Sequence, residues 1–224
     1  TFSIKLLNCF GFENIEADLS TRPEDSIGDD KDWEIATQSL EDALNIQKIS
    51  YKIANGEGAF YGPKIDLHVK DAIGRRWQLT TIQIDFAQPD NFSLEYINSD
   101  NKKVRPVMIH RALLGSIERF TGILTEHYAG VFPGWLAPTQ VNILTIGNVD
   151  DYLKTITKKL STYRINIDDR NIRLGEKIHE SKKSKIPVTL IIGENDAKNN
   201  TIAINYIDGI ESKDIEISEG MKSI

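Results

Sequence analysis

The stretch that decides the fold is residues 107–120, Val-Met-Ile-His-Arg-Ala-Leu-Leu-Gly-Ser-Ile-Glu-Arg-Phe. Its apolar beginning predicts a strand over Pro106–His110, and the helical spacing that follows predicts a helix from about Ala112 to His127. A strand that runs directly into a helix would place His110 at the strand's end, where the chain meets a cleft. The first helical turns then carry two small residues and a cation, which are Gly115, Ser116 and Arg119.

These residue types together suit a flat, charged ligand. Small side chains leave room for such a ligand, and the guanidinium of Arg119 can lie over its face or meet a phosphate. Taken singly, each residue has a simpler interpretation, because a lone histidine is usually structural and an arginine on a helix is usually solvated.

A second unusual stretch lies upstream, at residues 58–64, Gly-Ala-Phe-Tyr-Gly-Pro-Lys. Its glycines allow a backbone or a ligand to approach closely, and Tyr61 offers a ring and a hydrogen-bond donor. Lys64 is a point charge suited to phosphate. The alternative interpretation is a tight turn closed by an aromatic plug.

Two glutamines mark the strand predicted over Arg76–Phe86, which pairs as a hairpin with the alternating strand that begins near Lys64. Gln78 and Gln83 are five residues apart, so a regular strand would point them to opposite faces. Both can face one pocket if a bulge intervenes, and we place it near Thr80–Thr81. The alternative is the ordinary polarity of an edge strand.

The chain changes its rhythm after Pro138, and we predict a domain boundary there, giving domains 1–138 and 139–224. Upstream, the pattern indicates an α+β arrangement in which helices cover an antiparallel sheet. Downstream, strands and helices alternate, which is typical of an α/β layer with a mixed five-stranded sheet. Four of the five strands are predicted at residues 141–146, 165–168, 187–192 and 201–206, with helices at 151–160 and 174–184.

Composition excludes several classes of protein. The 224 residues are 40% hydrophobic and 27% charged, as in soluble globular domains. The sequence shows no leader or spanning apolar run, and Cys9 is its single cysteine, so we expect a cytoplasmic protein without disulfides or a membrane anchor. The net charge is −6, but acidic and basic residues balance from Val141 onward. A local basic patch for nucleic acid therefore remains compatible with this sequence.

Five segments in order resemble the class II aminoacyl-tRNA synthetases, and within that family the threonyl branch. The strand–helix pair carrying Gly115 and Arg119 is similar to the third signature motif of that class. The matching segments are Ser20–Glu24, Gly56–Lys64, Trp77-Gln78, Gln83–Phe86 and Met108–Phe120. The resemblance implies a partial class II catalytic domain followed by an α/β anticodon-binding domain.

The resemblance implies a pocket that binds ATP with magnesium and forms threonyl-adenylate. Arg119 would stack on adenine and neutralise the bent triphosphate. Catalytic roles fall to Arg119, Lys64 and Gln78, and the ATP contacts to Arg119, Gln78 and Gly115.

Threonine would contact Tyr61, Gln83 and Ser116 by the same resemblance. His110 matches the last of three zinc ligands, of which the other two would lie upstream of this chain. We accordingly expect the 224 residues alone to hold no stoichiometric zinc, with the ring nitrogens of His110 facing water.

The C-terminal part resembles the anticodon-binding domain shared by several class II enzymes. The anticodon contacts would come from Arg170, Asn171, His179, Lys182, Asp196 and Asn205. The lysines of the helix after Gly175, which include Lys177, would hold phosphate; the alternative is that they complement the helix dipole.

The implied activity is that of a ligase that joins threonine to the 3′ end of threonine tRNA. Its partners would be threonine tRNA, ATP and L-threonine, and the full-length enzyme would be a homodimer. The first two signature motifs and an editing domain are expected to lie outside this sequence. Two alternatives stay open, a non-catalytic tRNA-binding fragment and a related ligase such as the prolyl enzyme.

Overall fold

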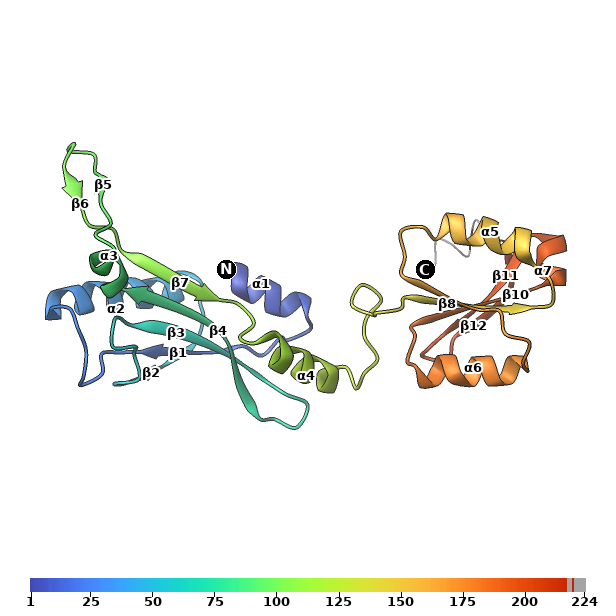
Figure 1. Ribbon diagram of the computed structural model, residues 1–224. Coiled ribbons are helices and arrows are strands. Elements are labelled where there is room, and N and C mark those ends of the chain that lie inside the picture. The colour runs from blue at the N-terminus through green and yellow to red at the C-terminus, as the bar shows by residue number, and fades with distance from the viewer. Residues whose placement is uncertain (217–218, 220–224) are drawn as a thin grey trace. The chain divides into compact units, whose positions relative to one another are not determined.

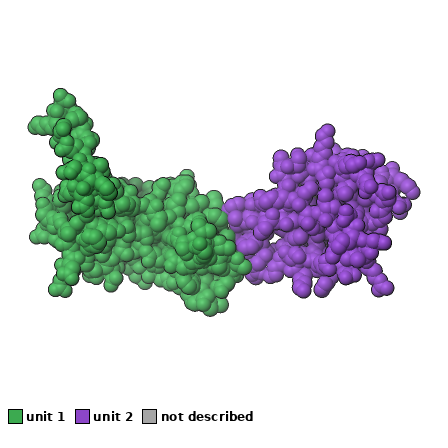
Figure 2. Space-filling model, viewed as in Figure 1, with its two compact units in different colours: residues 1–127 green, residues 128–224 purple. Residues whose placement is uncertain are grey.

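The computed structural model describes residues 1–216 and 219, and it divides into two compact units, Thr1–His127 and Tyr128–Ile224 (Figures 1 and 2). Among the described residues, no helix is long and apolar enough to cross a membrane. The division falls before the predicted boundary at Pro138, because Arg164 donates hydrogen bonds to the carbonyls of Trp135 and Ala137 and so ties this stretch to the second unit.

The first unit is built on a five-stranded sheet in the order β2-β1-β3-β4-β7. The strands are β1 (Glu16–Ser20), β2 (Tyr51–Ala54), β3 (Lys64–Lys70), β4 (Arg76–Asp85) and β7 (Met108–Ala112). The predicted antiparallel pairing is confirmed except that β1 and β2 run parallel. The helices are α1 (Phe2–Cys9), α2 (Asp30–Ile46), α3 (Ala87–Asn91) and α4 (Ile117–His127), and the short strands β5 (Tyr96–Ile97) and β6 (Lys103–Val104) form a hairpin.

The two faces of this sheet have different chemistry. One face packs against α2, which begins where the side chain of Asp29 accepts a hydrogen bond from the Asp32 amide. The core between them contains Ala17, Leu19, Ala36, Leu40, Leu44, Ile65, Leu67 and Ile84. Because side chains alternate along a strand, the polar residues of β3 and β4 collect on the opposite face.

The bulge expected near Thr80–Thr81 lies just before them, at Leu79, and it brings the two glutamines to that polar face. The β3–β4 register shifts between Leu67 and His68, which pair with Thr80 and Gln78 and leave Leu79 as the extra residue. Gln78 and Gln83 therefore share a face although they are five residues apart.

The turn before α4 departs from the sequence prediction. We expected the helix from about Ala112, with Gly115 and Ser116 on its first turns, but β7 continues to Ala112 and α4 begins at Ile117. Gly115 has a φ of +66°, which is outside the helical range. Ser116 precedes the helix, and its hydroxyl accepts a hydrogen bond from the Arg119 amide at 3.2 Å, as an N-cap does.

The second unit contains the predicted mixed five-stranded sheet, in the order β12-β11-β10-β8-β9. Its strands are β8 (Val141–Ile146), β9 (Ile165–Asp168), β10 (Val188–Gly193), β11 (Thr201–Tyr206) and β12 (Glu211–Glu216). Helices α5 (Asp150–Lys159) and α7 (Glu194–Asn199) lie on one face, and α6 (Leu174–Lys183) lies on the other (Figure 1). The buried core on the α5 side includes Ile143, Ile156, Leu160, Leu190, Ile192, Ile202 and Ile204.

Candidate functional site

One row of side chains crosses the polar face of the first unit. Lys64 on β3 pairs in register with Gln83 on β4, which pairs in turn with His110 on β7. The hydroxyl of Tyr61 donates a hydrogen bond to Gln83 Oε1 at 2.8 Å, and its ring centre lies 6.3 Å from that of His110. The structure thus brings together Tyr61, Gln83 and His110, which the sequence places far apart.

Asp66 is the hub of a second cluster on this face, and sequence reasoning missed it. Its carboxylate is buried, and it meets Lys64 Nζ at 2.8 Å and Gln78 Nε2 at 2.5 Å. The Thr81 hydroxyl donates to the same carboxylate at 2.6 Å. A buried carboxylate with this many donors is satisfied, so Asp66 fixes the positions of Lys64 and Gln78. The alternation of Asp66 with apolar residues along β3 was the sequence signal that places it on this polar face.

Arg119 reaches back from α4 to β4. One of its terminal nitrogens donates to the backbone carbonyl of Gln78 at 2.6 Å. A Cβ atom added to Gly115 would lie 2.6 Å from that nitrogen, so the glycine is what lets the guanidinium cross the turn. Arg119, Gln78 and Gly115, which were predicted to share a pocket, are therefore neighbours.

His110 is held differently from the prediction. It lies in the middle of β7, not at its end, and its Nε2 is 2.7 Å from Asp85 Oδ2 instead of facing water. Burial alone would raise the pKa of Asp85, but the Gln88 and Ala87 amides and His110 together lower that pKa below its usual value. The carboxylate is therefore charged at neutral pH and fixes the imidazole.

This pairing is the one that metal-ligating histidines commonly have, with one ring nitrogen on a carboxylate and the other left for the metal. Within residues 1–216 and 219, however, no group of three or more His, Cys, Asp or Glu residues could hold a metal ion. His110 therefore has the carboxylate partner typical of a metal-ligating histidine, and the described residues do not complete a metal site around it.

The second unit has a crevice at the carboxyl ends of β8 and β9. The chain leaves β8 toward α5 and leaves β9 toward α6, so the two connections run to opposite faces of the sheet (Figure 1). Open α/β sheets bind ligands where neighbouring connections diverge in this way. The crevice encloses about 410 Å³, and its walls include Gly147, Asn148, Arg170, Asn171 and Leu174.

Of the six predicted anticodon residues, Arg170 lines the crevice, and the other five fall into two groups. Asn171, His179 and Lys182 are exposed, and Asn171 lines the crevice. Asn205 is buried on β11, and Asp196 is engaged locally, because its carboxylate accepts hydrogen bonds from the Gly193 amide and the Thr201 hydroxyl. These contacts give Asp196 a role in starting α7.

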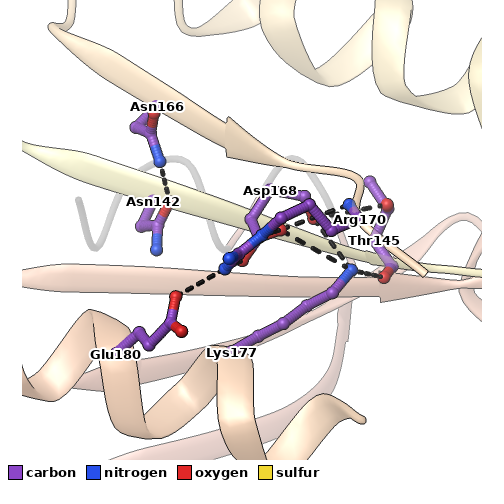
Figure 3. Close-up of polar contacts among 7 residues, drawn as sticks. All are labelled: Asn142, Thr145, Asn166, Asp168, Arg170, Lys177 and Glu180. Carbon is purple, nitrogen blue, oxygen red and sulfur yellow. Dashed lines mark hydrogen bonds and ion pairs between the residues drawn. The ribbon is translucent and has the colours of Figure 1, made fainter. Parts of the chain in front are cut away.

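Lys177 corrects the expectation that the lysines of α6 hold phosphate. It is 2% exposed, and its Nζ donates to the carbonyls of Thr145 at 2.9 Å and Asp168 at 3.0 Å (Figure 3). Lys177 therefore ties together the ends of β8 and β9, beside the crevice.

Two family models cover most of the chain. The "tRNA synthetase class II core domain (G, H, P, S and T)" matches residues 5–128, and the "Anticodon binding domain" matches residues 140–224. The chain belongs to the class II tRNA synthetase family.

The similar proteins include threonine–tRNA ligases. The chain is 52% identical over 202 residues to the threonine–tRNA ligase of Finegoldia magna, covering 89% of this chain and 32% of that protein. It is 46% identical over 225 residues to the threonine–tRNA ligase of a Sulfurihydrogenibium species, covering 99% and 35%. The solved RNA binding domain of threonyl-tRNA synthetase from Cryptosporidium parvum Iowa II is 33% identical, with a TM-score of 0.90, covering 99% of this chain and 57% of that one. The chain thus spans about a third of the length of the curated relatives it matches.

Proposed function

We propose that this chain supplies part of the adenylation pocket and the anticodon-binding domain of a threonine–tRNA ligase. In that reaction the threonine carboxylate attacks the α-phosphorus of magnesium-bound ATP and pyrophosphate leaves. The tRNA 3′-terminal ribose hydroxyl then attacks the threonyl carbonyl and AMP leaves. The observation that carries the proposal is that Tyr61, Gln83 and His110 converge on the face of the sheet that also carries Gln78, whose backbone carbonyl holds Arg119.

The experiment is threonine-dependent ATP–pyrophosphate exchange by a hybrid in which the 224-residue chain replaces the matching part of the Finegoldia magna ligase. Exchange with threonine, and none with proline, is the expected result. A folded hybrid that exchanges neither amino acid would contradict the proposal.

The ATP side of the pocket is proposed to consist of Arg119, Lys64, Gln78 and Gly115. The Arg119 guanidinium already has one donor on Gln78 O, which fixes its plane and leaves other donors for phosphate oxygens. Lys64 is held by Asp66, so its charge is placed before any ligand arrives. Preorganised charge of this kind stabilises the transition state without reorganisation.

The threonine side is proposed to consist of Tyr61, Gln83 and Ser116, with His110 as one ligand of a zinc ion. Tyr61 donates a hydrogen bond to Gln83, and Gln83 lies opposite His110 on the neighbouring strand, so the three side chains adjoin one another. When bound, zinc would hold the amino group and hydroxyl of threonine, and valine would leave it short of a ligand. Ser116 lies at the start of α4, where its hydroxyl also accepts from the Arg119 amide.

The 224-residue chain on its own is expected to bind less than stoichiometric zinc. A protein zinc site needs at least three side-chain ligands, and His110 lacks two partners among the described residues. Elemental analysis of the purified chain checks this, with the His110→Ala variant as the control. One zinc per chain that disappears in His110→Ala would show that other residues of the chain complete the site.

The crevice of the second unit is proposed to bind the tRNA anticodon. Splayed single-stranded bases are read by hydrogen-bonding side chains, and Asn171 lines the crevice as such a group. The exposed Lys182 on α6 would hold phosphate, and His179 lies exposed on the same helix. Arg170 also lines the crevice, and Asp196 and Asn205 are proposed only as supporting residues, given their local hydrogen bonding and burial.

Asn171→Ala is expected to reduce discrimination among anticodons by about tenfold, because a lost base contact affects one base. Lys182→Ala should weaken binding of all anticodons alike and lower the salt dependence. Fluorescence anisotropy with stem-loop RNAs that differ in one anticodon base, at several salt concentrations, measures both. Equal weakening of every RNA by Asn171→Ala would argue against base reading.

A second candidate function is RNA binding without catalysis. It is favoured by the absence of a complete metal group among the described residues. Exchange by the hybrid together with RNA binding by the unfused chain would support the ligase, whereas RNA binding without exchange would support this alternative. For the ligase, a homodimer in the cytoplasm remains our proposal from the family resemblance.

A further inference from the structure

A second hollow lies beside α6, next to the crevice, and the proposed function does not use it. It encloses about 320 Å³, within the range of small-ligand sites. Its wall combines two amides, two carboxylates and two cations, from Asn142, Asn166, Asp168, Arg170, Lys177 and Glu180 (Figure 3). Arg170 lines both the hollow and the crevice.

The charges of the hollow cancel. Lys177 is buried against the end of β9, and Arg170 pairs with both acids, at 2.7 Å to Asp168 Oδ2 and 2.5 Å to Glu180 Oε2. No surplus cation remains for a phosphate, and no surplus carboxylate remains for a metal ion. The lining therefore suits a neutral ligand that makes hydrogen bonds.

Arg170 offers such a ligand a flat surface. Its Nε donates to Asp168 Oδ1 at 2.9 Å, so bonds to two carboxylates fix the guanidinium in its own plane. These bonds lie within the plane and leave the faces of the group open, and the side chain is 52% exposed. A guanidinium plane is a stacking surface for an unstacked nucleobase.

Asn142 offers a hydrogen-bond donor. It is 4% exposed, and its Oδ1 accepts from Asn166 Nδ2 at 2.8 Å across the β8–β9 pair. Figure 3 shows its own amide nitrogen pointing away from Asn166, toward the side of the sheet where α6 lies. Among the described residues that nitrogen donates no hydrogen bond, and it is not one of the fully enclosed atoms that lack a partner, so it is open to the hollow that Asn142 lines.

We propose that this hollow is a second nucleobase site, in which a base stacks on the Arg170 guanidinium and accepts a hydrogen bond from the Asn142 amide. The inference rests on the proposed anticodon function and adds a base to it. Because Arg170 lines both hollows, successive nucleotides of one loop can occupy the crevice and the second site.

The test measures binding of the 224-residue chain to a threonine-tRNA anticodon stem-loop and to versions with a single abasic nucleotide at each loop position. With the wild-type chain, abasic changes at two neighbouring positions should each weaken binding about tenfold, as loss of a stacked base does. Arg170→Lys and Asn142→Leu should each weaken binding of the intact stem-loop by a similar factor. In each variant, one of the two abasic changes should no longer weaken binding further, while the other still does.

The controls separate the possible failures. Arg170→Lys keeps the charge, so the salt dependence should not change. Asn195 is exposed on α7, so the Asn195→Leu variant should bind like wild type. Thermal unfolding checks that each variant is folded. If Asn142→Leu does not fold, the Arg170→Lys variant tests the proposal alone. Uniform weakening at all loop positions, or a reduced salt slope, would overturn the second site in favour of a phosphate contact. Tight binding by both variants would overturn it while leaving anticodon binding intact, and absence of wild-type binding would reject the proposed function itself.

Discussion

Replacement of Arg119 by alanine is expected to lower threonine-dependent ATP–pyrophosphate exchange by a hundredfold or more, about 3 kcal/mol of transition-state stabilisation. Its guanidinium is fixed on Gln78 O and fitted against Gly115, so its charge is in place before pyrophosphate begins to leave. Loss of a preorganised group affects the chemical step most, and anticodon stem-loop binding should stay unchanged.

The measurement is exchange by the hybrid enzyme, with Arg105→Ala as the matched control. Arg105 pairs with Asp90 and the Leu94 carbonyl, outside the polar face, so its removal should leave exchange near wild type. Should Arg119→Ala and Arg105→Ala exchange at the same rate, Arg119 would be a surface residue and the assignment of the motif would be wrong.

Gly62→Ala should destabilise the first unit by about 3 kcal/mol, which is large for the addition of one methyl group. A Cβ at Gly62 would lie 2.0 Å from the carbonyl oxygen of Ile84 and 2.8 Å from its carbon, and both are backbone atoms of β4. The segment that carries Tyr61 would therefore have to move away from Gln83. Urea unfolding followed by near-ultraviolet circular dichroism measures the loss.

Gly122→Ala is the matched control for that experiment. Gly122 lies in α4, and a Cβ there would meet no atom within 4 Å. Alanine at an exposed helical position should stabilise the unit by up to about 1 kcal/mol, so the two substitutions are expected to have opposite signs. Destabilisation of similar size by both would mean that glycine-to-alanine changes act here through something other than the close contact with Ile84.

The buried strands of the second unit were the easiest elements to predict. The predicted strands at 141–146 and 201–206 agree with β8 and β11, which are mostly apolar and largely buried. The predicted strand at 165–168 agrees with β9, an edge strand in which isoleucines alternate with polar residues. By contrast, β12 (Glu211–Glu216) was not located. It is a mostly exposed edge strand with charged residues, and its sequence does not differ from that of a polar loop.

The residues of the candidate site could be predicted from the sequence, but the side chains that they contact could not. The sequence singled out Gln78 and His110 from local motifs, but the carboxylates that fix them, Asp66 for Gln78 and Asp85 for His110, act through strand register and long-range pairing. Lys177 shows the same limit on a helix. A run of lysines indicates a solvated face, and only the packing of α6 on β8 and β9 reveals that this member turns inward.

The bulge at Leu79 has a consequence for how the length of this hairpin can change. Leu79 and Thr80 are both buried, so the side chains of these two successive residues of β4 point to the same face of the sheet, and regular alternation resumes after them. Removing Leu79 would remove the bulge and leave Gln78 and Gln83 four residues apart, so a regular strand would keep both on the polar face. One residue added between Gln78 and Thr81 would instead turn Gln78 away from Asp66. Changes of length in the turn at 71–75 and loss of the bulged residue are therefore compatible with the pocket, and an added residue between Gln78 and Thr81 is not.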